Sequence, residues 1–461
     1  MKYFILSAAC SFVSISLFSD SASAAEPLPL SKAYWKDAAF IKSFNGSYRI
    51  NARIEPQVST EERGVLLSIQ SLMVSGERKS ALKKIEGNKL IKTSAAFMFN
   101  AGNIHFELGD MEAAEKQYQS AIKIFPSFRR AYRNLGFVYA NLGDWEKALP
   151  ALEEALRLGD QDGSTYGQLA YGRLHQEQYA SALQSYRLAQ VTQPDNVDWK
   201  AGVAQCLQYL DRDEEALALL DEVIRVRPTE VSYYLLQSSI QLSLGRNDEA
   251  LVNLEYVRRL GDDKLDAENH LLLAQLHIQS GNLTLAEPLL KKAVTKEKKA
   301  LYTSSLNTLS FVIGQRHWEL GKSFFAAINE SYTGTQNPKL DAKKSRLHAV
   351  MKIESGEDLE GGVSILESLV KKDPLDAQSL VLLGRQRMIA NKPHVAEMLF
   401  RQAAHIPEHE YESRVELTQL CVAMKRYPDA VKELKLALKL QNSSQLREYK
   451  EAIEKLAESA L

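Results

Sequence analysis

Hydrophobic and small positions recur every 34 residues along the middle of this chain, in five units that start at residues 95, 129, 163, 197 and 231. Each unit carries two successive helical patterns. Small or compact residues return at three fixed places, where two packed helices approach each other. At the eighth place these are Gly102, Gly136, Ala170, Ala204 and Ser238; at the twentieth Ala114, Ala148, Ala182, Ala216 and Ala250; at the twenty-seventh Ala121, Ala155, Ala189, Val223 and Val257.

Breaker residues separate the predicted helices. Leu108-Gly109-Asp110 and Leu142-Gly143-Asp144 fit the turn inside a unit, because glycine accepts the left-handed conformation at a helix end. Pro126, Pro194 and Pro228 close three of the units. A 34-residue helix–turn–helix unit resembles the tetratricopeptide repeat (TPR), and this resemblance implies an all-α, right-handed α-solenoid.

Less regular units extend the array to about eleven. One begins near Glu62, where Ser59 and Glu62 form a predicted capping box. Others begin near Ala267, Thr303, Lys343, Ala377 and Tyr411. We therefore expect an N-terminal array at 59–295, an irregular repeat and loop at 296–342, a C-terminal array at 343–443 and a capping helix at 444–461. The loop is either a hinge between two arrays or an ordinary long loop.

The first 58 residues follow another pattern. Residues 1–24 have a basic start, a short apolar run and Ala22-Ser23-Ala24, which predicts a cleaved signal peptide and a periplasmic protein. Lipidation at Cys10 is a weaker alternative, and the apolar run is short for a membrane anchor, so no membrane span is expected in the mature protein. In the extended segment 25–58, residues 47–55 alternate as a strand, which either straps the first repeat or pairs with a partner strand.

Charge and composition limit the function. The chain has 57 Lys and Arg against 58 Asp and Glu, a formal net charge of −1, which disfavours binding to nucleic acid. Of its three cysteines, Cys206 and Cys421 fall at packing positions of distant units, so we expect buried free thiols.

The sequence contains no convincing combination of catalytic residues. His405 to His409 matches the zinc-protease pattern H-x-x-E-H, but Pro407 falls where a helix should stop, and the pattern needs one continuous helix. His270 and His277 are read as structural histidines. We expect no enzyme activity, no cofactor and no metal.

The first helices of TPR units line the concave side of such an array. This predicts a groove that binds a protein partner, centred on residues 103–209, although the same residues could simply be an exposed helix face. The cluster Arg129, Arg130 and Arg133 suits an acidic partner segment. The predicted groove residues are Phe99, Asn103, Phe106, Arg130, Arg133, Asn134, Phe137, Asn141, Tyr171, His175, Gln205, Gln208 and Tyr209.

Three stretches resemble a narrower group: residues 54–64, residues 124–135 and the run from Arg227 to Glu230. They are similar to envelope TPR proteins of Gram-negative bacteria described as components of the TonB system. The resemblance implies a periplasmic, non-enzymatic accessory of the machinery that energises outer-membrane receptors. Its partners would be TonB-system components or an outer-membrane protein. The alternative is a TPR factor for assembly or export of outer-membrane proteins or polysaccharide. The sequence indicates no oligomeric state.

Overall fold

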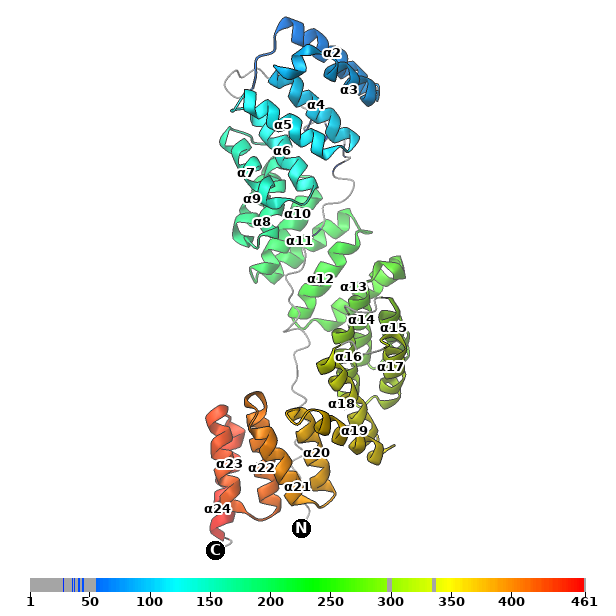
Figure 1. Ribbon diagram of the computed structural model, residues 1–461, viewed down its shortest axis with the longest axis vertical. Coiled ribbons are helices and arrows are strands. Elements are labelled where there is room, and N and C mark those ends of the chain that lie inside the picture. The colour runs from blue at the N-terminus through cyan, green and yellow to red at the C-terminus, as the bar shows by residue number, and fades with distance from the viewer. Residues whose placement is uncertain are drawn as a thin grey trace. The chain divides into compact units, whose positions relative to one another are not determined.

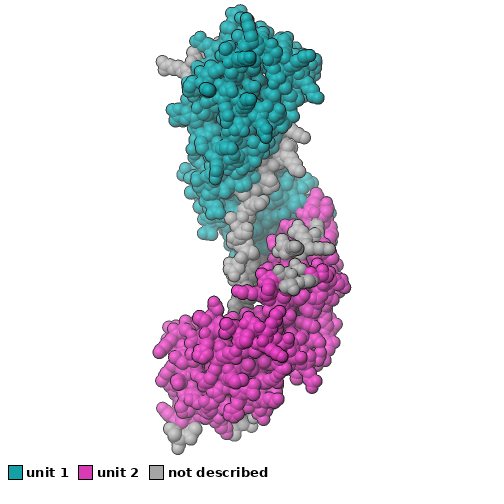
Figure 2. All heavy atoms as spheres, viewed as in Figure 1, with its two compact units in different colours: residues 1–260 teal, residues 261–461 magenta. Residues whose placement is uncertain are grey.

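A computed structural model describes Leu28, Trp35, Asp37, Phe40, Ile41, Phe44 and residues 55–296, 301–333 and 337–459. These residues form helices and their connections, with no strand among them. Figure 1 shows successive helices stacked as antiparallel pairs. The chain divides into two compact units, residues 1–260 and 261–461, which Figure 2 draws in teal and magenta.

Unit 1 contains six helix pairs in its described part. They are α2 (Thr60–Val74) with α3 (Arg78–Glu86), α4 (Ala95–Leu108) with α5 (Met111–Ile124), α6 (Arg129–Asn141) with α7 (Trp145–Arg157), α8 (Gly163–His175) with α9 (Tyr179–Thr192), α10 (Val197–Tyr209) with α11 (Asp213–Val226), and α12 (Val231–Ser243) with α13 (Asn247–Leu260). A 3-10 turn, η2 (Lys89–Lys92), precedes α4.

The described part of unit 2 contains five pairs and a final helix. They are α14 (Ala267–Gln279) with α15 (Leu283–Lys296), α16 (Tyr302–Gly314) with α17 (Trp318–Ser331), α18 (Pro338–Glu354) with α19 (Leu359–Lys372), α20 (Ala377–Ile389) with α21 (Pro393–Ala404), α22 (Glu410–Ala423) with α23 (Tyr427–Leu440), and α24 (Ser444–Ser459). The turns η3 (Asp262–Lys264) and η4 (Pro407–His409) precede α14 and α22.

The predicted all-α solenoid of about eleven units is confirmed. The five regular units begin at the predicted residues, with α4, α6, α8, α10 and α12 starting at 95, 129, 163, 197 and 231. One later start is wrong: α18 begins at Pro338 rather than near Lys343, because Asn337 caps the helix and Pro338 occupies its first position.

Small residues at the eighth place are required by close packing within a pair. A Cβ on Gly102 of α4 would lie 2.7 Å from Cε1 of Tyr118 in α5. A Cβ on Gly136 of α6 would lie 2.6 Å from Cδ2 of Leu152 in α7. The large residue of the second helix therefore occupies the space that the small residue leaves.

Turns and caps also follow the sequence. Gly109 and Gly143 take left-handed φ values of 82° and 75° at the turns between paired helices. The Ser59 capping box is present, with Ser59 N donating to Glu62 Oε2 at 2.7 Å and Glu62 N donating to Ser59 Oγ at 3.2 Å. At the other end α24 packs on α23 and buries Ile453, as expected of a capping helix.

Some predictions fall outside the described residues. The signal peptide, residues 1–24, lies there, and so does the predicted strand up to residue 54; its last residue, Glu55, is described as a bend. Residues 296–342 include a helix pair, α16 and α17, and residues 334–336 of the following loop are not described. The hinge and the domain boundaries stay predictions.

Candidate peptide-binding surface

The first helices of consecutive pairs, α4, α6, α8 and α10, contact one another in sequence. We call the side chains at their predicted groove positions the A-helix face. Described residues of the chain's own N-terminal segment lie against it: Leu28, Trp35, Phe40, Ile41, Phe44 and Glu55.

Phe40 and Phe44 belong to a helical turn that the sequence specifies locally. Phe40 N donates to Asp37 Oδ1 at 3.0 Å and Ile41 N donates to Asp37 O at 2.9 Å, so Asp37 caps this turn. Phe40 and Phe44 are four residues apart and share one face of it. At this point the A-helix face therefore holds a helical turn.

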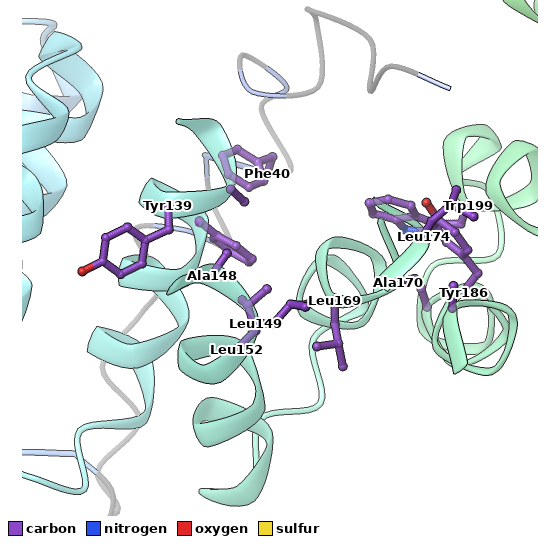
Figure 3. Close-up of a cluster of buried hydrophobic side chains, with 14 of the residues drawn as sticks. Phe40, Tyr139, Ala148, Leu149, Leu152, Leu169, Ala170, Leu174, Tyr186 and Trp199 are labelled. Carbon is purple, nitrogen blue, oxygen red and sulfur yellow. The ribbon is translucent and has the colours of Figure 1, made fainter. Parts of the chain in front are cut away.

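Both phenylalanines enter an aromatic cluster on α4 and α6. The ring of Phe44 stacks on Phe106 with centroids 4.2 Å apart, and the ring of Phe40 lies 5.6 Å from that of Phe137. Trp35 meets Phe40 edge-on at 5.4 Å. Phe40 belongs to a buried hydrophobic cluster of unit 1, part of which Figure 3 shows. Burial of these rings is the main apolar contribution to docking.

A buried amide network holds the main chain of the segment. Asn134 Nδ2 donates to Phe44 O at 3.0 Å and to Asn103 Oδ1 at 2.9 Å. Asn103 Oδ1 also accepts from Tyr118 Oη at 2.7 Å. Arg133 Nε donates to Asn134 Oδ1 at 3.3 Å. Because the acceptor on the segment is a backbone carbonyl, these donors recognise a polypeptide without reading its side chain.

An acidic residue of the segment meets the arginine cluster. Glu55, only 3 % exposed, accepts from Arg130 Nε at 3.0 Å and from Arg129 at 3.4 Å. The Arg130 guanidinium also lies 5.0 Å from the ring centroid of Phe99. Burial raises the pKa of Glu55, although Arg130, Arg129 and Arg133 oppose the shift. Desolvation therefore offsets part of the attraction.

The segment also reaches α10. The main-chain N–H of Leu28 donates to Gln205 Oε1 at 2.7 Å, and Gln205 is buried. As with Asn134, a groove amide pairs with the backbone of the segment. Eight of the predicted groove residues on α4, α6 and α10 are buried: Phe99, Asn103, Phe106, Arg130, Arg133, Asn134, Phe137 and Gln205.

The other five predicted residues remain accessible. Asn141 and His175 are exposed, and Tyr171, Gln208 and Tyr209 are partly exposed. Tyr171 and His175 pack with Trp145, whose ring stacks on that of His175 at 5.2 Å. Tyr209 stacks on Tyr179 at 4.4 Å, and burial raises the pKa of Tyr209 to about 12. We call these five the accessible residues of the A-helix face.

Sequence reasoning treated Arg130 and Arg133 as surface residues, and this is wrong. Each is 5 % exposed, because the N-terminal segment covers the A-helix face where they lie. Reasoning from repeat positions also missed Phe40, Phe44 and Glu55. Their signal was present as a capping Asp37 followed by aromatic residues at 40 and 44.

The other sequence features considered for a metal site, a reactive thiol or a membrane span were checked against the described residues. Within the described ranges no group of three His, Cys, Asp or Glu side chains could hold a metal ion. The H-x-x-E-H run is broken, since α21 ends at Ala404 and a separate 3-10 turn spans Pro407–His409. Cys206 and Cys421 are buried free thiols, as predicted. No helix among the described residues is long and apolar enough to cross a membrane.

Comparison with curated proteins finds partial relatives. The chain is 26 % identical to the TPR repeat-containing protein YpiA of Bacillus subtilis over 158 residues, which is 34 % of this chain and 37 % of that protein. It is 25 % identical to Protein FlbA of Caulobacter vibrioides over 264 residues, 55 % of this chain and 41 % of that protein. The chain thus spans well under half the length of either relative.

Two solved structures are similar to parts of this chain. One is YrrB, described as a TPR protein with an unusual peptide-binding site, at 23 % identity and a TM-score of 0.37 over 43 % of this chain and 96 % of that one. The other is PilF of Pseudomonas aeruginosa, at 17 % identity and a TM-score of 0.40 over 49 % of this chain and 99 % of that one.

Family models described as tetratricopeptide repeat match residues 66–228 and 235–300. The first range contains the helix pairs from α4–α5 to α10–α11 with the close-packed Gly102 and Gly136, and the second begins within α12 and contains α13, α14 and α15. Over these residues the chain matches the tetratricopeptide repeat.

Proposed function

We propose that this protein is a non-enzymatic adaptor of the bacterial periplasm that binds protein partners through the A-helix face of unit 1. The observation that carries the proposal is the hydrogen bonding of Asn134 and Gln205 to the backbone of a polypeptide segment. A surface that already holds a peptide with buried donors and aromatic contacts has the chemistry needed to bind others. The repeat architecture supports this, because TPR domains mediate protein–protein interaction.

The proposed periplasmic location and the proposed TonB-system partners are supported by sequence patterns alone. The leader pattern at 1–24 supports export, and the stretches at 54–64 and 124–135 resemble TonB-system TPR proteins. We propose on this basis that the partners belong to the TonB-dependent energy-transduction system. The adaptor would act by holding components together, with no reaction of its own.

Site-directed photo-crosslinking in cells tests the proposal. A photoreactive amino acid at His175 or Gln208, both on the accessible part of the A-helix face, should capture an envelope protein that mass spectrometry then identifies. Val252, which is exposed on α13, provides the matched control position. Capture of no TonB component, at a depth where known TonB contacts are detected, would refute the TonB assignment.

Localisation needs its own measurement. Cell fractionation should place the protein with periplasmic markers, and N-terminal sequencing should find a mature chain that begins near Ala25. A cytoplasmic protein that retains Met1 would contradict the proposed compartment.

A further inference from the structure

The N-terminal segment occupies the part of the A-helix face that is best equipped to bind a peptide. Phe44 is 1 % exposed between Phe106 and Phe137, and its carbonyl accepts from Asn134. This contact is non-covalent. A residue that the chain supplies from outside its repeats therefore fills a site built by the repeats.

The contacts divide into a general part and a selective part. Asn134 and Gln205 pair with backbone groups and would accept any sequence. Selectivity comes from the rings of Phe106 and Phe137, which receive two aromatic side chains from one helical turn, and from the arginine cluster, which receives a carboxylate. This is the pattern of a short helix docked on a repeat surface through anchors at i and i+4.

The positive charge of the arginine cluster indicates that the bound peptide carries an acidic residue. Arg129, Arg130 and Arg133 all act on the carboxylate of Glu55, and Arg133 has a second acid, Asp162, at 3.8 Å. Departure of Glu55 would remove the carboxylate on which all three arginines act. An entering peptide would have to supply a carboxylate to the same guanidinium groups.

We propose that the surface formed by α4 and α6 is a binding site for a partner peptide with an aromatic pair four residues apart and a following acidic residue, and that Phe40, Phe44 and Glu55 of the N-terminal segment form its resident competitor. This inference rests on the proposed function and adds the chemistry of the partner. The tethered segment acts at an effective concentration of about millimolar, so wild-type protein binds an outside peptide weakly until the segment is displaced.

Competition with a fluorescent peptide tests the proposal. The probe has the sequence of residues 34–57 of this chain, and fluorescence polarisation measures its binding to the full-length protein. Replacing both Phe40 and Phe44 by alanine in the protein removes the competitor without altering α4 or α6. This variant should bind the probe at least about tenfold more tightly than wild type, since more of its sites are vacant. Glu55→Gln, a milder change, should give a smaller increase.

Three controls make the result interpretable. A probe with alanine at positions 40 and 44 should not bind the freed protein. Adding Asn134→Ala to the freed protein should weaken binding of the intact probe by about tenfold or more. Leu67→Ala, an exposed change on α2, should leave probe binding at the wild-type level. Circular dichroism should show that the repeats of each variant remain folded.

Two results would overturn the proposed competition between the N-terminal segment and a partner peptide. If the folded double variant and Glu55→Gln both bind the probe no better than wild type, the proposal is overturned. In a dimer with exchanged segments, the N-terminal segment of one copy would occupy the site of the other copy. Light scattering that shows such a wild-type dimer would therefore overturn the proposal, because the occupant would be a second copy of this chain. Neither result depends on an envelope partner, so the photo-crosslinking experiment at His175 and Gln208 can still succeed or fail independently.

Discussion

The side-chain amide of Asn134 donates a 3.0 Å hydrogen bond to the main-chain oxygen of Phe44, which lies 90 positions earlier in the chain. Asn134 is one of the predicted groove residues, and Phe44 lies outside every repeat. Their contact makes the N-terminal segment part of the site.

Replacing Asn134 by alanine should destabilise unit 1 by about 1–3 kcal/mol, because Phe44 O, Asn103 Oδ1 and Arg133 Nε all lose a buried partner. Urea unfolding followed by circular dichroism measures the change. Asn141→Ala, an exposed position of the same helix, is the control and should stay within about 0.5 kcal/mol of wild type. Equal effects of the two substitutions would show that the buried network contributes nothing.

The double substitution Arg130→Glu with Arg133→Glu should destabilise the protein, whereas a surface location would predict little change. Both guanidinium groups are buried, and the new carboxylates would face Glu55 with only Arg129 left to offset the negative charge. We expect a loss of about 3 kcal/mol or more, and faster proteolysis before residue 55 as the segment is released. Arg225→Glu, on the exposed side of α11, should have little effect on either measurement. An unchanged melting temperature and cleavage rate would contradict the buried ion pair.

Gly102→Ala should cost about 1–3 kcal/mol, since its Cβ would lie 2.7 Å from the buried ring of Tyr118. Gly64→Ala is the matched control, because α2 leaves the space around Gly64 empty. There alanine should stabilise the helix by up to about 1 kcal/mol. Thermal unfolding of the two variants should therefore shift in opposite directions, and a shift of the same sign would refute the packing argument.

Cys206 and Cys421 should resist alkylation in the folded protein. Burial raises the pKa of Cys206 to about 12 and raises that of Cys421, so neither forms the reactive thiolate near pH 8. In a Cys10→Ser background, iodoacetamide at pH 8 should modify both residues only after unfolding. Rapid labelling of native protein would show that one of them is accessible.

The same shift fixes the direction of a pH effect. The pKa of Cys206 is higher in the folded protein than the usual value of about 8.5 in an unfolded chain. Its stabilising contribution is therefore complete below about pH 8.5 and declines as pH rises toward about 12. Cys206→Ala should reduce the loss of stability between pH 8 and pH 10, measured by urea unfolding at each pH.

Most of the fold could be predicted because it is encoded locally. A small residue at the eighth place and a turn glycine such as Gly109 act within one unit, so their spacing alone located five helix starts. Lys343 failed as a start because the local cap, Asn337 with Pro338, overrides the average spacing.

The sequence did not predict that the N-terminal segment covers the A-helix face and buries its residues. Repeat positions identified Arg130 and Asn134 as residues on the A-helix face, but their burial depends on Phe44 and Glu55, which come from a segment with no repeat pattern. The sequence did allow a strap over the first repeat. It gave no measure of whether aromatic contacts and an ion pair outweigh the entropy of ordering the segment.

The bond from Leu28 to Gln205 also bears on cooperativity, because it joins positions 177 apart in the chain. In a repeat array each unit is stabilised by its immediate neighbours, so opening can start at an end and spread one unit at a time. The N-terminal segment adds couplings that bypass this order, linking α10 to the residues that contact α4 and α6. Hydrogen exchange should accordingly find α4 to α10 opening as one block while the segment is docked, and as separate repeats once it is released.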